Sequence, residues 1–328
     1  MRSFMRKKGF AYLVGVALVA VLPHLIGLAG SAWMHTFVIV GVYGILTVSL
    51  NLIRGYTGQI CISHVAMYGI GAYGSALVGI KLGVNFWLAL LIGALMAGMV
   101  GLFIGWVSLG LRGVYFAITT LAFLRLIGAI LTNWIGLTGG EVGLYGVPRP
   151  SIAGFVFEPT NRVAWIYLAF GFLILSVFIV DRIVNSRMGR ALIAIREDED
   201  LAKSTGINTF NYKMISMGIS SFLAGIGGGL YGAYMGTITP ADCAVIPSVM
   251  AMAGLVMGGQ GTMLGPIIGS VFVNLLPELL RLTGEYYFIM FGVIMILFII
   301  FLPRGVMGVI ASLRARLRAR TSIKEVGV

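Results

Sequence analysis

The chain has too few charged residues to form a soluble domain. Only 10% of its 328 residues are Asp, Glu, Lys or Arg, whereas 59% are hydrophobic. Soluble domains carry about 25% charged residues, so this supply does not cover a water-facing surface. Apolar runs long enough to cross a bilayer, which takes about 20 residues, recur along the chain. The composition therefore predicts a membrane protein with many spans.

Cysteine and buried acids are also scarce. Cys61 and Cys243 do not make a disulfide framework, and both are interpreted as small apolar side chains. The eleven acidic residues all fall in loops or near the ends of predicted spans. Because proton-driven carriers place a carboxylate or histidine within the membrane, and only His64 is a candidate, ion-coupled transport is disfavoured.

The sequence has no phosphate-binding loop of the pattern G-x-x-x-x-G-K-[ST]. No segment is large enough for a soluble catalytic domain. If ATP is hydrolysed, we therefore expect a partner chain to do it. The residues predict no catalytic group, no metal site and no cofactor.

What the chain does contain is a series of hydrophobic segments, which predict an all-α polytopic membrane protein with residues 1–328 as a single transmembrane domain. About ten transmembrane or half-membrane helices are expected. The segment 246–258 is short and lies between Pro247 and the glycine run 258–261, so it is predicted to be a half-helix or re-entrant piece. The segments lie near 10–30, 34–53, 63–81, 85–109, 113–132, 162–181, 212–235, 246–258, 263–281 and 286–303.

The net charge of +12 is concentrated in clusters beside the predicted spans. They lie at residues 2–8, 182–213 and 304–324. Such clusters mark the cytoplasmic side of a membrane and contact its anionic lipids. We therefore predict both termini in the cytoplasm, lipid contacts and no nucleic-acid partner.

Two hydrophilic loops differ in character. The outer loop 133–162 is rich in Gly and Pro and is predicted to be irregular, meeting a partner or capping a cavity. The inner loop 181–213 contains "REDEDLAKSTGIN", with Asp198 at a predicted helix start, Lys203 near its end and Gly206 just past it. Acids at the first turn, a base at the last and a terminal glycine are typical of a short capped helix. This helix either connects two spans or docks into a cytoplasmic motor.

Two glycine-rich breaks interrupt the hydrophobic pattern at comparable positions. They are "RGYTGQ", with Gly55, Tyr56, Gly58 and Gln59, and "GGQG", with Gly259 and Gln260. A broken helix within the bilayer is tolerated where protein or a water-filled cavity satisfies its backbone, and transporters use such breaks on substrate paths. The alternative is tight packing with ordinary turns.

Three further polar residues are candidates for function. Ser63 and His64 could suggest nucleophilic chemistry, but neighbours in sequence do not make a catalytic triad, so His64 is interpreted as structural. Arg125 lies roughly 20 Å along a helix from Arg112, deep in the predicted membrane. It faces the bundle interior or an aqueous path, or it snorkels outward if the segment starts later.

Taken together, these stretches resemble the LivM-type permeases of branched-chain amino acid ABC importers. The resemblance follows the family's order from about residue 40 to 305. It rests on "NLIRGYTGQICISHVAMYGIGAY", "LRGVYFAITTLAF", "TGGEVGL", "MGRALIAIREDEDLAKSTGIN", "GGQGTMLGPIIGS" and "FLPRG".

The resemblance implies a permease subunit in a bacterial cytoplasmic membrane, with leucine, isoleucine and valine as cargo. The implied partners are a sister permease of the LivH type, two cytoplasmic ATP-binding subunits and a periplasmic or lipid-anchored solute-binding protein. The coupling motif of ABC importers would fall on Asp200, Leu201, Ala202 and Gly206. The implied translocation path includes Gly55, Tyr56, Gly58, Gln59, Ser63, His64, Arg125, Gly259 and Gln260.

The chain departs from the family pattern in ways that leave its cargo open. Residues 61–64 read Cys-Ile-Ser-His where Ser-Leu-Gly-His is common. Arg125 replaces a usual Glu or Gln, and Glu141 stands where a small or polar residue is usual. Urea, short amides or other amino acids are therefore alternative cargoes. An ion-coupled carrier and an intramembrane enzyme built on Ser63 and His64 are the disfavoured rivals.

Overall fold

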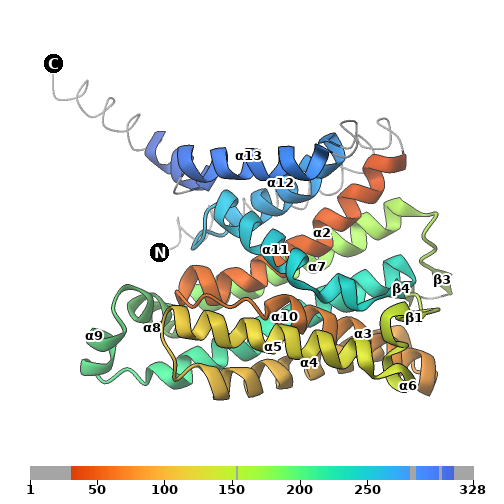
Figure 1. Ribbon diagram of the computed structural model, residues 1–328, viewed down its shortest axis with the longest axis horizontal. Helices are drawn as coiled ribbons and strands as arrows, with labels where there is room; N and C mark the ends of the chain where they lie inside the picture. The colour runs from red at the N-terminus through yellow and green to blue at the C-terminus, as the bar shows by residue number, and fades with distance from the viewer. Residues whose placement is uncertain (1–30, 153, 281–285, 303–304, 314–328) are drawn as a thin grey trace.

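The computed structural model describes residues 31–152, 154–280, 286–302 and 305–313 (Figure 1). The predicted first span at 10–30 and most of the two terminal basic clusters lie outside these residues. Six helices among the described residues are long and apolar enough to cross a membrane. They are α2 (Ser31–Asn51), which continues into the π-helix η1 (Leu52–Tyr56), α3 (His64–Leu82), α4 (Phe86–Ser108), α5 (Val114–Asn133), α7 (Arg162–Val184) and α10 (Thr209–Met235).

These bounds agree with the predicted segments to within a few residues, and the all-α prediction is confirmed. Three shorter apolar helices follow, α11 (Val245–Gly258), α12 (Gly265–Leu280) and α13 (Tyr287–Phe301). With 14 residues, α11 is roughly 21 Å long, less than the ~30 Å hydrocarbon core. It has the length of the half-helix that the sequence predicts.

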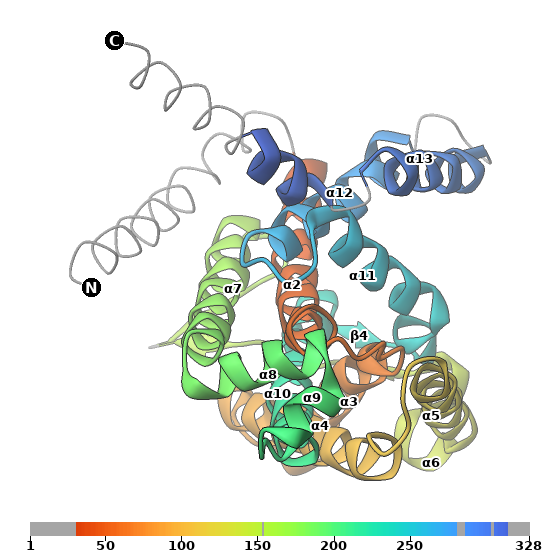
Figure 2. The ribbon, with the colours of Figure 1, turned by 90° about the vertical axis from the view of Figure 1, so that its left-hand side faces the viewer.

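Glycines set the spacing of the central bundle. In Figure 2, α2 lies centrally, with α7, α10 and α11 around it. The helices α3, α4 and α10 pack on one another so closely that a Cβ on Gly71 would overlap the backbone of Gly225, and a Cβ on Gly228 would overlap the carbonyl of Tyr68. Small residues allow this approach between membrane helices.

The outer loop is more ordered than the sequence predicts. It contains α6 (Ile135–Thr138), the 3-10 helix η2 (Gly140–Val142) and the strands β1 (Leu144–Tyr145), β2 (Ser151–Ile152) and β3 (Phe155–Val156). Strand β1 pairs antiparallel with β4 (Thr237–Ile238), which follows α10, and β2 pairs with β3. The pairing of β1 with β4 is non-local, so the Gly- and Pro-rich composition of the loop does not reveal it.

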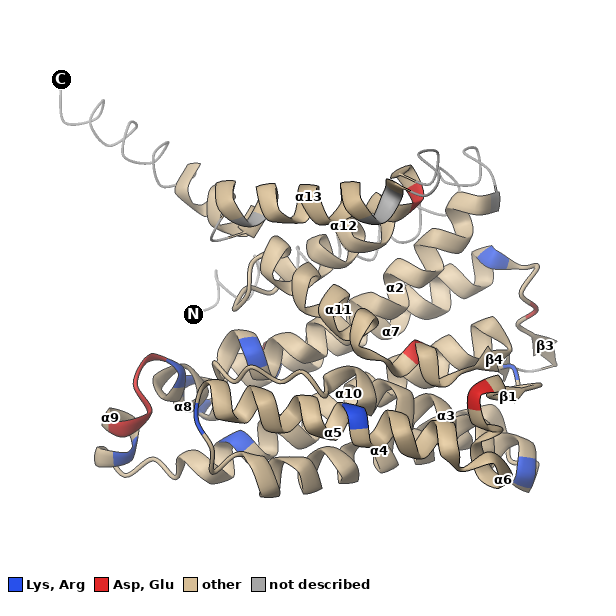
Figure 3. Cartoon of the chain, viewed as in Figure 1, with Lys and Arg blue, Asp and Glu red and all other residues tan. Residues whose placement is uncertain are grey.

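The two ends of the bundle differ in charge (Figure 3). The α9 end carries the helices α8 (Arg187–Glu197) and α9 (Glu199–Ser204), and the α6 end carries the short strands. The α6 end holds Lys81, Arg149 and Arg162 among its described residues. The α9 end holds Arg54, Arg112, Arg182, Arg187, Arg190, Arg196, Lys203 and Lys213.

Candidate functional site

The two glycine-rich breaks meet at the α9 end of the bundle. Asn51, 1% exposed at the end of α2, donates from its side-chain amide to the Thr262 carbonyl at 2.8 Å and accepts from the Gly261 N–H at 2.8 Å. Gly55 lies so close that a Cβ there would overlap the Asn51 side-chain oxygen and the Gly261 nitrogen. We call Asn51, Gly55, Gly261 and Arg196 the glycine junction.

Arg196 attaches α8 to this junction. Its guanidinium donates to the Gly55 carbonyl at 2.5 Å, which gives the irregular π-turn a charged hydrogen-bond donor. Gly58 lies against the Arg196 side chain with a φ of +78°, and Gly261 has a φ of +76°, a backbone conformation that glycine adopts without strain. The junction therefore joins α2, α8 and the α11–α12 turn.

The other predicted residues of the breaks lie around the junction with different exposure. Tyr56 is buried, Gln59 is half-buried, and Gly259 is buried with a φ of +114°. The side chain of Gln260 is exposed and makes no hydrogen bond to a described residue. Gln59 and Gln260 therefore differ in exposure.

Ser63 and His64 are both buried, but they do not hydrogen-bond to each other. The Ser63 hydroxyl lies 3.4 Å from the Cys61 sulfur, and His64 Nε2 lies 2.9 Å from the Ser49 hydroxyl. His64 Nδ1 has no hydrogen-bond partner among the described residues, so no carboxylate orients the ring. Within the described ranges, no group of three His, Cys, Asp or Glu side chains could hold a metal ion.

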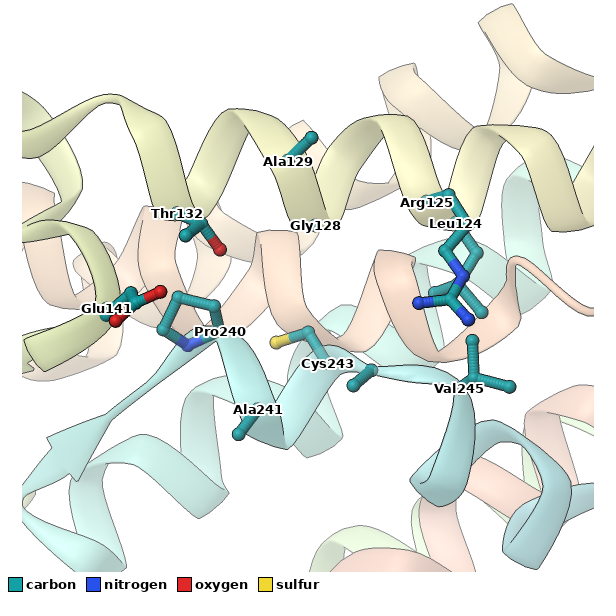
Figure 4. Close-up of a pocket in the computed structure, with 11 residues that line it drawn as sticks. Leu124, Arg125, Gly128, Ala129, Thr132, Glu141, Pro240, Ala241, Cys243 and Val245 are labelled. Carbon is teal, nitrogen blue, oxygen red and sulfur yellow. The ribbon is translucent and has the colours of Figure 1, made fainter.

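A pocket of about 590 Å³ lies on the other side of the bundle, between α5 and the segment that leads into α11 (Figure 4). Its α5 wall consists of Leu124, Arg125, Gly128, Ala129 and Thr132. Its opposite wall consists of Pro240, Ala241 and Cys243 from the 3-10 helix η3 (Pro240–Cys243), followed by Ala244 and Val245. Glu141 of η2 closes one end.

Arg125 and Glu141 lie toward opposite ends of this pocket (Figure 4). Both side chains are exposed, and neither makes a hydrogen bond or ion pair to a described residue. The sequence marks each separately as a departure from the family pattern. It gives no signal for Pro240, Ala241 and the other residues of the opposite wall, because they are small or apolar.

The inner loop forms the capped helix that the sequence predicts. The Asp198 carboxylate accepts the N–H groups of Asp200 and Leu201 at the start of α9, both at 3.0 Å. After the last turn, Gly206 has a φ of +83°, and the Ile207 N–H donates to the Ala202 carbonyl. Leu201 is 63% exposed, whereas Ala202 is buried. The helix therefore presents a large apolar side chain to its surroundings.

Two ion pairs hold α9 against the spans. Arg112, in the turn between α4 and α5, makes a bidentate pair with Asp200 at 2.8 Å, and both side chains are exposed. The hydrogen bond from Arg112 lowers the pKa of the Asp200 carboxyl. Lys213 of α10 is 1% exposed and pairs with Glu199 at 2.5 Å. Burial alone would raise the pKa of Glu199, but hydrogen bonds from Lys213 and Lys203 lower it below its ordinary value.

Comparison with known proteins shows what the chain is similar to. It is 31% identical over 317 residues to the high-affinity branched-chain amino acid transport system permease protein LivM of Escherichia coli (strain K12), covering 90% of this chain and 74% of that protein. The probable branched-chain amino acid transport permease protein LivM of Methanocaldococcus jannaschii is 27% identical, with 81% of this chain and 90% of the relative covered.

The permease protein LivH of the same E. coli transport system is also 27% identical, with 81% of this chain and 91% of the relative covered. No solved structure matches the chain significantly. The family described as "Branched-chain amino acid transport system / permease component" matches residues 33–300. The chain is therefore a multi-pass membrane protein that belongs to the permease components of branched-chain amino acid transport systems.

Proposed function

We propose that this chain is the membrane-spanning subunit of an ATP-driven importer that carries leucine, isoleucine and valine into a bacterial cell. The observation that carries the proposal is the family match over residues 33–300, together with relatives named for branched-chain amino acid transport. Residues 1–328 act as one transmembrane domain. The glycine junction and the α5 pocket belong to its translocation core. The buried residues Ser63 and His64 belong to the same core.

In this proposal the α9 end faces the cytoplasm and the α6 end faces the periplasm. The greater number of Lys and Arg residues at the α9 end supports this orientation. Both termini then lie in the cytoplasm of a cell with the chain in its cytoplasmic membrane. Anionic lipids of the inner leaflet contact the basic residues of that end.

A sister permease of the LivH type completes the membrane unit. The outward face of α5 supports this partner, because Ile118, Leu126 and Ile130 are 58%, 53% and 45% exposed. A solute-binding protein docks at the loop 133–162, and two ATP-binding subunits dock at the α9 end.

The helix α9 couples the ATP-binding subunits to the spans. Leu201 offers the apolar contact, Ala202 packs inward, and Gly206 ends the helix. Asp200 transmits the movement to the α4–α5 turn through Arg112. Asp200 pairs with Arg112 of the α4–α5 turn, and Glu199 pairs with Lys213 of α10. A displacement of α9 therefore moves α5 and α10 together.

Uptake by the reconstituted complex tests the function. The four-part complex is placed in proteoliposomes with ATP on the side of the ATP-binding subunits, and labelled leucine and binding protein are supplied on the other side. With ion gradients collapsed, we expect uptake that requires both ATP and binding protein. Leucine uptake by this chain alone, driven by an imposed ion gradient, would contradict the proposal.

A substitution on α9 tests the coupling. Leu201→Ser removes the exposed apolar contact without disturbing the ion pairs, so ATP hydrolysis stimulated by the binding protein should fall about tenfold or more, the scale of an interface hot spot. Ile193→Ser on α8, where the side chain is 38% exposed, is the matched control and should stay near the wild-type rate. Equal rates in the two variants would remove α9 from the coupling path.

A further inference from the structure

Arg125 is a charge at the middle of a membrane helix, and no described residue of the chain pairs with it. It lies eleven residues past Val114, the first residue of α5, which is roughly 16 Å along the helix axis. Among the described residues no acceptor binds its guanidinium, and its side chain projects into the pocket opposite Val245 (Figure 4). A charged group at this depth faces a bundle interior or an aqueous path and needs a counter-charge.

A second source of positive potential faces the same part of the pocket. Val245, the first residue of α11, lies across from Arg125 (Figure 4), and Ala244 before it also lines the pocket. No side chain caps α11, so its first N–H groups lack side-chain partners and carry the positive end of the helix dipole. A guanidinium beside a helix N-terminus is suited to one chemical group above others, a carboxylate held by charge-assisted hydrogen bonds.

The opposite charge lies at the other end of the pocket. Glu141 is beside Thr132 and Pro240 (Figure 4), and Thr132 follows Arg125 by seven residues on α5, about 10 Å along the axis. Glu141 has no basic partner among the described residues. It therefore offers an ammonium-binding carboxylate at the α6 end, which in the proposed orientation is the periplasmic end.

We infer that this pocket selects a zwitterionic amino acid at two successive stations, with Glu141 receiving its ammonium at the outer mouth and Arg125 with the α11 N-terminus receiving its carboxylate deeper in the membrane. One α-amino acid carries both groups on the same carbon atom, so it occupies the stations in turn. Leu124, Ala129 and Ala241 also line the pocket and suit an apolar side chain. Urea and short amides lack the carboxylate, so the deeper station rejects them.

The identity of the cargo in this inference rests on the proposed import function. The electrostatic part, a positive potential near Arg125 and a negative potential near Glu141, does not depend on it. Thiol labelling measures this local potential in the assembled complex with its native cysteines replaced by serine. We expect a cysteine at position 245 (Val245→Cys) to react faster with an anionic thiosulfonate than with a cationic one. A cysteine at position 132 (Thr132→Cys) should show the reverse preference.

Neutralising Arg125 is the decisive change for the labelling. Arg125→Gln should lower the ratio of anionic to cationic labelling rates at position 245 about tenfold, because a charged cleft concentrates ions of opposite sign by factors of this order. Arg149→Gln is the control, since Arg149 is exposed on the outer loop that carries Glu141 and lies outside the pocket. Equal reagent preferences in wild type and Arg125→Gln would overturn the inference.

Leucine uptake supplies the second measurement. Arg125→Gln should lower uptake about tenfold, since a hydrogen bond to a charged group contributes about 1.5–3 kcal/mol, while Arg125→Lys should retain part of it and Arg149→Gln all of it. Uptake unchanged in Arg125→Gln would overturn the inference and leave the import function standing. No leucine uptake by wild type, with the labelling pattern intact, would instead overturn the proposed cargo and keep the charged stations.

Discussion

The glycine junction and the α5 pocket treat their polar groups in opposite ways. In the junction, the Asn51 amide, the Gly55 carbonyl and the Gly261 N–H all bind one another or Arg196. In the pocket, Arg125 and Glu141 bind nothing in the described chain. Buried polar groups in proteins are nearly always paired. The paired groups of the junction therefore indicate a structural connection, whereas the exposed charges of Arg125 and Glu141 remain available to a ligand or a partner subunit.

The ion pairs of α9 lie between these extremes. Lys213 and Glu199 are paired and largely buried, whereas Arg112 and Asp200 are paired and exposed. If pairing marks structure and lack of pairing marks function, stability should respond most to overpacking of the junction, next to loss of the Lys213–Glu199 pair, then to loss of the Arg196 hydrogen bond, and least to changes in the pocket. Transport should respond to the pocket even where stability does not. The following variants test that order.

The largest loss of stability is expected from Gly55→Ala. The added Cβ would overlap the Asn51 oxygen and the backbone of Gly261, and backbone cannot move aside as a flexible side chain can. Overpacking of this kind costs about 3 kcal/mol or more, enough to deplete the folded protein. The measurement is the yield of monodisperse protein in detergent and its melting temperature. Gly171→Ala is the control, because no atom lies within 4 Å of the added Cβ.

Removing Glu199, the partner of the buried Lys213, should cause the next largest loss of stability. Glu199→Gln leaves the Lys213 ammonium without a counter-charge, which costs about 3 kcal/mol, the lower end of the range for a broken buried pair, because Glu199 is 17% exposed. Thermal unfolding measures it, with Glu197→Gln as the control, since Glu197 is exposed at the end of α8.

The same pair fixes the pH dependence of that difference. Because the pKa of Glu199 is lowered in the folded state, its stabilising contribution is complete above the unfolded pKa of about 4.3. The contribution disappears as the pH falls through the folded value. The difference between wild type and Glu199→Gln should therefore be constant from pH 6 to 8 and shrink in acid; a difference that grew in acid would exclude this pair as its cause.

A smaller effect is expected from Arg196→Ala. It removes the donor to the Gly55 carbonyl, and an unsatisfied buried acceptor costs about 1–3 kcal/mol. Arg190→Ala, on the same helix with an exposed side chain, should change stability by less than about 0.5 kcal/mol. If both variants melt at the same temperature, Arg196 does not hold the junction.

The smallest change in stability is expected in the pocket. Arg125 has no partner among the described residues, so Arg125→Gln should melt within about 2 °C of wild type or slightly above it, because neutralising an unpaired charge in the membrane costs nothing. The measurement is thermal unfolding of the purified complex. A loss as large as that of Arg196→Ala would break the comparison, since it would mean that Arg125 has a structural role.

The sequence predicts the positions of the helices better than it predicts the contacts between residues that are far apart in the chain. Hydropathy locates the spans because each depends on its own residues, and Asp198 and Gly206 delimit α9 because capping is a local property. The contact between Asn51 and Gly261 spans 210 positions, and the pairing of β1 with β4 spans a little under half that number. The pocket is not predictable from the sequence for a different reason. Arg125 and Glu141 can be recognised as unusual charges, but the small and apolar residues among 240–245 that line the opposite wall carry no chemical signal.

The length of chain between the partners of Asn51 has a consequence for biosynthesis. A ribosome adds about 5–20 residues per second, so the 210 residues that separate Asn51 from Gly261 take roughly 10–40 s to make. Throughout that time α2 is already synthesised while its terminal amide has neither of its final partners. The junction therefore forms late in synthesis, and a nascent chain that stops before the α11–α12 turn leaves the Asn51 amide without either of these partners.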